Sequence, residues 1–291
     1  MEENPLFSNI MGESTQIHDL LKQVEKVAAS PTATILIRGE SGTGKELIAR
    51  SIHTCSSNAN GPFIELNCAA IPESLLEAEL MGYEQGAFTD ARARKKGLLE
   101  LAHNGTIFLD EIDSLSLNLQ AKLLKIIDDK MFRRLGGVEE IHVDLRIIAA
   151  TNANLNTAIA KQQFREDLYY RLNVIALELP PLRDRGDDVV LVAEHFLQRY
   201  NTEYGKQVQG FTPGAIALMH AYSWPGNIRE LKNVIERTVL LGEKTTLEPE
   251  DLPIDRRHSD QRQDEKQEIP DNSVPPEQTR WQGDPSLRQW M

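Results

Sequence analysis

The chain has 291 residues, of which 40% are hydrophobic and 26% charged, so it can bury a substantial core and has the composition of an ordinary globular protein. Its formal net charge of −12 argues against binding of nucleic acid over the whole surface, because proteins that bind in this way are usually basic. No apolar run approaches the roughly 20 residues that a membrane helix needs, and Cys55 and Cys68 lack metal-ligand spacing, so we expect a cytoplasmic protein with reduced thiols and no membrane partner.

Short apolar runs alternate with amphipathic stretches from about residue 33 to residue 181. Because β-branched residues follow one another with little polar alternation, five of these runs indicate buried parallel strands, with helical patterns between them. The runs are ATILIRG (33–39), PFIELNC (62–68), GTIFLDE (105–111), HVDLRIIAATN (142–152) and VIALELP (174–180). This order predicts an α/β domain over residues 1–181, with a parallel sheet flanked by helices on both faces.

The pattern changes after Pro180 and Pro181. Three helical patterns with proline or glycine at their ends follow, and no strand pattern is visible, so we expect a small all-helical domain over residues 182–253. Residues 254–291 are polar, contain proline and are poor in aliphatic side chains, which predicts a disordered tail or linker. No helix-turn-helix pattern occurs there, so DNA binding is not evident in this chain.

A glycine-rich segment, GESGTGKE, follows the first predicted strand and opens a helix, which is the setting of a phosphate-binding loop. Its glycines let backbone N–H groups face phosphate oxygens, and the helix N-terminus adds positive potential. Lys45 would reach the β- and γ-phosphates. The predicted ATP-binding residues of this loop are Gly39, Glu40, Ser41, Gly42, Thr43, Gly44, Lys45 and Glu46.

Glu46 replaces the serine or threonine that usually helps to hold Mg²⁺ after the lysine. Metal binding must therefore depend more on another carboxylate. A loop that binds nucleotide without hydrolysing it is the alternative.

Polar side chains at the ends of successive strands complete the predicted site, because ligands of parallel α/β sheets bind at the carboxyl ends of the strands. Asp110 is suited to binding Mg²⁺, and Glu111 to polarising the attacking water. The alternative is that both are simply solvated acids at the end of a strand. Asn67 is placed to hydrogen-bond Glu111 and hold it away from the water. Asn152 is placed to contact the γ-phosphate. Either asparagine alone would more often be a turn residue.

Six motifs occur in one order across residues 10–253: GESGTGKE, GAFTDA, GTIFLDEI, FREDLYYRLNV, PPLRDR and WPGNIRELKNVIER. Together they resemble the central AAA+ ATPase domain of bacterial enhancer-binding proteins, the activators of sigma-54 RNA polymerase. The resemblance implies a P-loop NTPase fold followed by a helical lid. It also implies a homo-oligomeric ring, usually a hexamer, that hydrolyses ATP with Mg²⁺ at subunit interfaces and remodels the closed promoter complex.

The resemblance assigns roles to the strand-end residues. Lys45 matches the phosphate-binding position, Asp110 the metal position and Glu111 the water-activating position. Asn67 matches the residue that switches the glutamate, and Asn152 the γ-phosphate sensor.

Three arginines also match functional positions of the family. Arg165 and Arg171 match the arginines offered to the neighbouring subunit's nucleotide, although salt bridges with Glu166 and Asp167 are the alternative. Arg229 matches the lid arginine that reports nucleotide state. The alternative is that Arg229 only pairs with a side chain three or four residues away on the same helix.

The GAFTDA motif lies in an insertion over residues 82–96 and resembles the GAFTGA loop, whose tip contacts the sigma factor. Phe88 and Thr89 match the tip residues. Asp90 stands where the family has glycine, and we expect its Cβ to oppose a positive-φ turn and its charge to pair with the basic residues at 92–96. Residues 132–144 resemble the second insertion, which couples nucleotide state to the first.

Two further functional hypotheses remain. Asp90 favours a regulatory subunit with impaired sigma-54 contact, which would form hetero-oligomers with a related activator. The other hypothesis is that the chain is an AAA+ ATPase that remodels another protein or DNA.

Overall fold

The computed structural model describes residues 10–30 and 33–254. A five-stranded parallel sheet has the strand order β2-β5-β8-β1-β9. Its strands are β1 (Ile35–Arg38), β2 (Phe63–Asn67), β5 (Thr106–Asp110), β8 (Arg146–Thr151) and β9 (Ile175–Glu178). All five predicted strands are confirmed. The central strand β8 is buried along its whole length, which explains its continuous apolar run.

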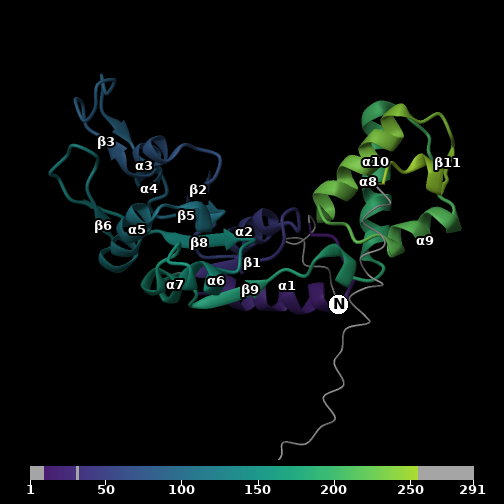
Figure 1. Ribbon diagram of the computed structural model, residues 1–291, viewed down its shortest axis with the longest axis horizontal. Coiled ribbons are helices and arrows are strands. Elements are labelled where there is room, and N and C mark those ends of the chain that lie inside the picture. The colour runs from purple at the N-terminus through teal and green to yellow at the C-terminus, as the bar shows by residue number, and fades with distance from the viewer. Residues whose placement is uncertain (1–9, 31–32, 255–291) are drawn as a thin grey trace, which may run out of the picture.

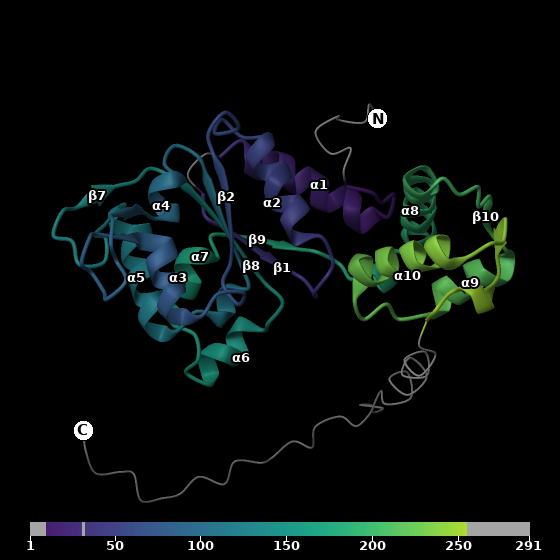
Figure 2. The same cartoon turned by 90° about the horizontal axis from the view of Figure 1, so that it is seen from above.

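Different helices cover the two faces of the sheet, as the alternation along β1 shows. Ile35 and Ile37 belong to one hydrophobic core and Leu36 to the other. The first core includes α1 (Thr15–Ala28) and α2 (Lys45–Thr54). The second includes α3 (Glu73–Met81), α4 (Leu98–Leu101), α5 (Leu117–Asp129), α6 (Leu155–Ala160) and α7 (Glu166–Leu172). The predicted helices on both faces are therefore confirmed (Figure 2).

A third core belongs to a separate lid of three helices, α8 (Asp188–Tyr204), α9 (Pro213–Ala221) and α10 (Asn227–Leu241). Trp224 lies in this core with 1% of its surface exposed, and its indole N–H donates to the Met219 carbonyl at 2.8 Å. The expectation of an all-helical lid is wrong in one detail, because β10 (Gly210–Phe211) pairs in parallel with β11 (Thr246–Leu247). Strands of two residues are too short to produce an alternating pattern.

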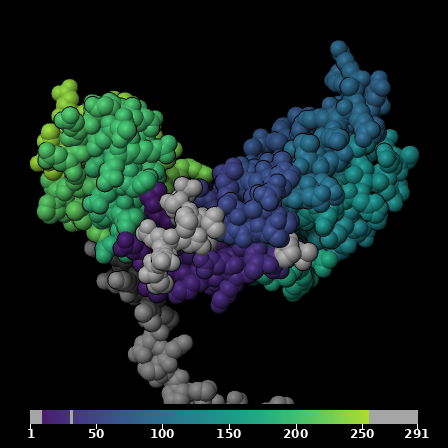
Figure 3. Space-filling view, turned by 180° about the vertical axis from the view of Figure 1, so that it is seen from behind, coloured from purple at the N-terminus to yellow at the C-terminus, as the bar shows by residue number. Residues whose placement is uncertain are grey.

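Two insertions lie at the end of the molecule opposite the lid (Figure 1), and the first stands out from the surface (Figure 3). The first contains the antiparallel pair β3 (Gly82–Tyr83) and β4 (Lys95–Lys96), and the second contains β6 (Met131–Phe132) and β7 (Ile141–His142). Backbone hydrogen bonds join the insertions, since the Leu135 N–H donates to Gly82 and the Leu135 carbonyl accepts from Glu84, both at 3.0 Å. No helix of residues 10–30 and 33–254 is long and apolar enough to cross a membrane.

A buried ion cluster locks the base of both insertions. Arg134, which is 5% exposed, contacts Glu84 at 2.7 Å and makes a two-pronged contact with Glu100 at 2.6 and 2.7 Å. Glu84 belongs to the first insertion, Arg134 to the second, and Glu100 to α4. One guanidinium therefore ties three segments together.

Replacing Arg134 by alanine would leave the Glu100 carboxylate, whose side chain is 9% exposed, without its partner. We expect the free energy of unfolding at pH 7 to fall by about 3 kcal/mol, because removing one partner of a buried ion pair leaves an uncompensated charge. Chemical denaturation measures the change. Arg133→Ala is the matched control: the Arg133–Glu140 pair is 57% and 50% exposed. Its loss should cost less than about 1 kcal/mol.

The effect of Arg134→Ala should also depend on pH. Burial alone would raise the pKa of Glu100, but the hydrogen bonds and charge of Arg134 outweigh burial and hold this pKa below its ordinary value of 4.5. A carboxyl whose pKa is lower in the folded state stabilises the fold above its unfolded pKa, and this contribution disappears as pH falls through the folded-state pKa. The destabilisation should be complete near pH 7 and shrink below about pH 4. A difference that is independent of pH would contradict the ion-pair explanation.

Candidate active site

The phosphate loop connects β1 to α2 and closes around a buried lysine. Lys45 is 8% exposed, and its amine donates to the carbonyls of Gly39 at 2.9 Å and Glu40 at 3.0 Å. The Thr43 hydroxyl also donates to the Glu40 carbonyl, at 2.8 Å. Burial lowers the pKa of Lys45, against the opposing effect of the negative charge of Asp110. Lys45 therefore folds back onto the carbonyls of its own loop, within range of the negative charge at the end of β5.

Asp110 and Glu111 lie at the carboxyl end of β5, and β8 separates this strand from β1, which leads into the phosphate loop. Glu111 adopts a left-handed conformation (φ 53°), and its N–H donates to the Asp110 carboxylate at 3.0 Å. Non-glycine residues rarely adopt this conformation, and such strain is common at functional sites. Nearby, the Thr151 hydroxyl donates to Asp113 at 2.5 Å and ties the ends of β5 and β8 together. Burial, with the charges of these acids, raises the pKa of Cys68 to about 12, so this thiol stays neutral.

Both predicted asparagines lie at strand ends, but only Asn152 lines a cavity together with residues of the phosphate loop. Asn67 faces Asp110 in the β2–β5 register, and its amide oxygen accepts from the N–H groups of Ala69 at 2.9 Å and Ala70 at 3.0 Å. The expected Asn67–Glu111 hydrogen bond does not occur among the described residues, and the Asn67 amide oxygen closes this turn instead. Asn152 lines a cavity of about 300 Å³ together with Gly39 and Glu40.

Arg165 immediately precedes α7 and Arg171 lies in its last turn, and each makes an exposed salt bridge. Arg165 contacts Asp167 at 2.7 Å, as the alternative interpretation allowed, and Arg171 contacts Asp128 at 2.8 Å. Their side chains are 41% and 50% exposed. Among the hydrogen bonds of residues 10–30 and 33–254, neither arginine reaches the phosphate loop of its own chain.

The start of α10 rests directly on the phosphate loop. Arg229 donates to the Ser41 hydroxyl at 2.9 Å, and the Ile228 N–H donates to the Gly42 carbonyl at 3.0 Å. Asn227, which is fully buried, donates to the Ser41 carbonyl at 3.0 Å. The predicted lid arginine therefore lies at the nucleotide loop. Asn227 was not predicted, although the WPGNIRELK motif contains it.

Arg183 and Arg185, from the PPLRDR motif, were also not predicted as site residues. Arg183 makes a two-pronged contact with Glu40 at 2.6 and 2.9 Å. Arg185 is 2% exposed and donates to the Thr43 carbonyl at 3.1 Å and the Pro180 carbonyl at 2.8 Å. Burial lowers the pKa of Arg185 to about 10, so it remains a cation at neutral pH.

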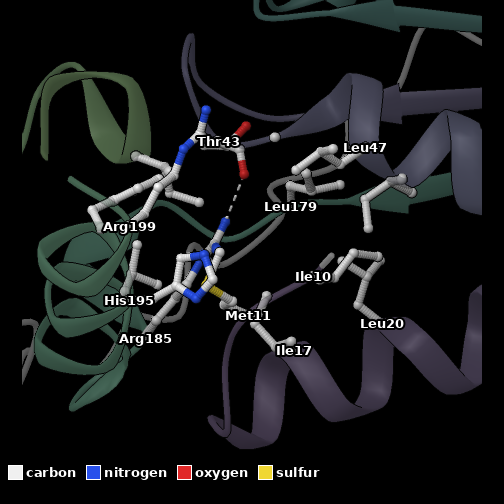
Figure 4. Close-up of a pocket in the computed structure, with 15 residues that line it drawn as sticks. Ile10, Met11, Ile17, Leu20, Thr43, Leu47, Leu179, Arg185, His195 and Arg199 are labelled. Atoms are coloured by element: carbon white, nitrogen blue, oxygen red, sulfur yellow. Dashed lines mark hydrogen bonds between the residues drawn. The ribbon is translucent and has the colours of Figure 1, made fainter. Parts of the chain in front are cut away.

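A cavity of about 270 Å³ lies between the phosphate loop, the N-terminal segment and α8 (Figure 4). Its wall is mostly apolar, and it includes Ile10 and Met11 of the N-terminal segment and Leu47 of α2. Arg185, His195 and Arg199 contribute the charged or polar groups on the lid side. Sequence patterns did not reveal this cavity, because its lining comes from four separate parts of the chain: residues 10–20, 43–48, 179–199 and Ile228.

The GAFTDA motif forms a compact turn with an exposed tip. Phe88 is 43% exposed, with its ring edge against Tyr83 at a centroid distance of 4.9 Å, and Thr89 and Asp90 are exposed. Two expectations for Asp90 are wrong. Asp90 does not have a positive φ, so its Cβ meets no left-handed strain. The nearby cations Arg94 and Lys95 pair with Glu84 and Glu79 instead, because those carboxylates lie beside the base of the loop.

Gly42→Ala tests the contact between loop and lid. A Cβ at Gly42 would lie 2.3 Å from the Gly226 carbonyl oxygen and 3.0 Å from the Arg229 Cβ, so the lid must move away. Gly186→Ala is the control: both glycines have positive φ, but nothing lies within 4 Å of a Cβ at Gly186. We expect both variants to lose about 1 kcal/mol of stability through strain, and only Gly42→Ala to bind a fluorescent ATP analogue roughly tenfold more weakly. Equal binding by the two variants would contradict this reading of the contact.

The fold matches solved structures of NtrX from Brucella abortus. The complex of that protein with ATP aligns with a TM-score of 0.79 and 38% identity, covering 87% of this chain and 55% of NtrX. The complex with ADP aligns with a TM-score of 0.79 and covers 86% of this chain and 55% of NtrX.

Curated relatives include transcriptional regulators. Regulatory protein AtoC of Escherichia coli is 53% identical over 85% of this chain and 53% of AtoC. Nitrogen fixation protein VnfA of Azotobacter vinelandii is 48% identical over 84% of this chain and 47% of VnfA. Transcriptional regulatory protein ZraR of Salmonella typhimurium is 48% identical over 84% of this chain and 55% of ZraR. The chain thus spans about half the length of these relatives.

Two family models match successive parts of the chain. Residues 10–178 match the sigma-54 interaction domain, and residues 183–269 match the AAA+ ATPase lid domain. The first match contains the phosphate loop, the acidic strand end and the GAFTDA turn, and the second contains the lid arginine. The chain therefore belongs to the AAA+ family of sigma-54-dependent transcriptional activators.

Proposed function

We propose that this chain is a Mg²⁺-dependent ATPase that assembles into a hexameric ring, by analogy with its family, and remodels the sigma-54 RNA polymerase promoter complex in the cytoplasm. One observation carries the proposal: the lid arginine, Arg229, contacts the same phosphate loop that encloses Lys45. Nucleotide bound at this loop would touch both domains at once, so its loss would change how they pack.

The loop and the neighbouring cavity divide the recognition of ATP between them. Lys45 donates to two loop carbonyls, and these contacts would be exchanged for phosphate oxygens when nucleotide binds. The cavity of about 270 Å³ suits the base, because an apolar wall with few polar groups is typical of small-molecule sites. Arg185 joins the two parts through the Thr43 carbonyl.

The donor set fits Mg²⁺ that is shared with the substrate. No group of three or more His, Cys, Asp or Glu side chains in the described residues is arranged to hold a metal. Mg²⁺ in ATPases usually takes one or two carboxylates and completes its shell with phosphate oxygens and water. Glu46 is engaged by Arg50 at 3.1 Å, so we assign the protein carboxylate to Asp110. When bound, the metal would neutralise charge on the phosphates.

Glu111 is the proposed general base for the attacking water. Glu111 follows Asp110 directly and has a left-handed backbone, and we assign the two acids different roles. Asn67, one strand away, is the proposed switch that controls Glu111: its amide oxygen closes the turn at residues 69–70, and its NH₂ group would donate to the Glu111 carboxylate. Asn152 is the proposed sensor of the γ-phosphate.

Hydrolysis should depend on assembly, because Arg165 and Arg171 are exposed and are proposed to stabilise the nucleotide of the neighbouring subunit. We expect turnover per subunit to rise with protein concentration and to fall by about 100-fold or more in Arg165→Ala and Arg171→Ala. Lys161→Ala, which removes an exposed cation nearby in sequence, should retain activity. Steady-state phosphate release measures all four proteins. Turnover that is independent of concentration and unchanged in the arginine variants would rule out the interface mechanism.

The sigma-54 contact is assigned to the tip of the first insertion. Phe88 and Thr89 are exposed there, and backbone hydrogen bonds tie this insertion to the second one. The aspartate at position 90, where the family has glycine, favours a second candidate function. In that case the chain would be a subunit that joins a hetero-oligomer but has an impaired contact with sigma-54. The unstrained backbone of Asp90 favours the activator instead.

Trapping with sigma-54 in the presence of a transition-state mimic separates these candidates. We expect the natural protein to be trapped and Phe88→Ala to lose the complex. Asp90→Gly should change the yield by no more than about twofold, because exposed, unstrained positions contribute within about 0.5 kcal/mol. Trapping by Asp90→Gly alone would instead support the co-assembling subunit. Transcription from a sigma-54 promoter provides the second readout.

A further inference from the structure

A buried aspartate fastens the N-terminal segment to the first turn of the lid helix α8. Asp188 is 2% exposed. One carboxylate oxygen, Oδ1, accepts from the N–H groups of Glu13 at 2.7 Å and Ser14 at 3.0 Å. The other, Oδ2, accepts from the Ser14 hydroxyl at 2.7 Å. Charge-assisted hydrogen bonds of this kind are stronger than neutral ones, so the contact fixes the position of a segment about 175 residues away in the sequence.

Gly12 permits this close approach. Its φ is 151°, and a Cβ at this position would lie 2.6 Å from Asp188 Oδ2 and 3.2 Å from the Ile17 side chain. A side chain here would displace the backbone from the carboxylate. The segment therefore passes directly over Asp188.

The fastened segment forms one wall of the nucleotide cavity. Ile10 and Met11, immediately before Gly12, line the cavity of about 270 Å³ with His195 of α8 (Figure 4). Ile10 packs on the core of the sheet domain and Met11 on the core of the lid. The wall therefore bridges both domains, and the hydrogen bonds at Glu13 and Ser14 set its position.

The chain just before α8 also reaches the other side of the cavity. Arg185 precedes Asp188 by one helical turn and donates to the Thr43 carbonyl of the phosphate loop at 3.1 Å. Within four residues, the lid thus contacts both the loop that would bind phosphates and the segment that would cover the base.

We propose that Asp188 is a positioning residue for the nucleotide: it holds residues 10–14 as the wall of the nucleoside cavity. The inference rests on the proposed ATP site. Asp188 does not touch the reacting atoms, so it controls affinity for the nucleotide and leaves the rate of hydrolysis at saturation unchanged.

The experiment compares Asp188→Ala, Asp188→Asn and Asp187→Ala. Asp187 is the matched control, because it is the adjacent acid and its side chain is fully exposed. Asp188→Ala should raise the KM for ATP and the Kd for a fluorescent ADP analogue roughly tenfold or more, with kcat changed less than about twofold, because three hydrogen bonds are lost. Asp188→Asn should stay within about threefold of the natural protein, because its amide oxygen accepts the two N–H groups and its NH₂ donates to the Ser14 hydroxyl oxygen.

Two measurements guard against an effect of folding alone. Hydrogen exchange should show the Glu13 and Ser14 amides protected in the natural protein and in Asp188→Asn, but not in Asp188→Ala. Gly12→Ala, which changes the other side of the contact, should reproduce the weaker binding of Asp188→Ala. All proteins are tested below the onset of their thermal unfolding.

The inference is overturned if Asp188→Ala binds nucleotide as tightly as Asp187→Ala, or if kcat falls while KM is unchanged. Lys45→Ala separates this failure from failure of the proposed function. If the natural protein binds nucleotide no better than Lys45→Ala, the ATP site itself is wrong. If the natural protein binds and Asp188→Ala binds equally well, only the positioning role is wrong.

Discussion

The contact between the phosphate loop and the start of α10 is the interaction on which the proposed mechanism depends. Glu40 receives hydrogen bonds from Arg183 and Asn227, and the Gly42 carbonyl accepts from Ile228. The hydrogen bonds of Arg183 are the main cause that lowers the pKa of Glu40, so this carboxylate is ionised at neutral pH. The Arg183–Glu40 pair is partly exposed, at 32% and 41%, and such pairs contribute little to stability. A nucleotide could therefore rearrange the Arg183–Glu40 pair at small cost, while the fully buried Asn227 keeps the start of α10 on the loop.

The nucleotide site and the insertions lie far apart, but one helix runs between them. The acidic end of β5 leads through a short 3-10 turn (Ile112–Ser114) into α5, and α5 ends at β6 of the second insertion. Arg134 then joins this insertion to Glu84 of the first. Because α5 packs on α7, which carries Arg171, a shift at the strand end would be passed toward both the insertions and the proposed subunit interface. These elements form one contiguous structural path from the end of β5 to both insertions.

Local patterns predicted the sheet, the phosphate loop and the lid helices, because each depends on neighbouring residues: continuous apolar runs for strands, and glycines before a helix for the loop. The same reasoning missed β10 and β11, whose two-residue strands have no period. It also missed the cavity and the Asp188 contact, since these join segments that are far apart in the sequence. At Asp90 the error is the opposite one: the sequence suggested a structural feature that the fold does not have. A family glycine suggested a positive φ, but the turn in this chain does not require one.

The salt bridges of Arg165 and Arg171 are compatible with their proposed role toward a neighbouring subunit. Each pairs with a carboxylate of its own chain in solvent, where an ion pair contributes at most about 1 kcal/mol. Transfer of either guanidinium to a phosphate in a dry interface would form stronger, charge-assisted hydrogen bonds. Asp167 and Asp128 would remain solvated, because their side chains are 47% and 48% exposed, so their loss of a partner costs little. In the proposed mechanism, an isolated subunit would therefore keep its arginines paired without opposing assembly, and the gain at the phosphate would arise only when a neighbour is present.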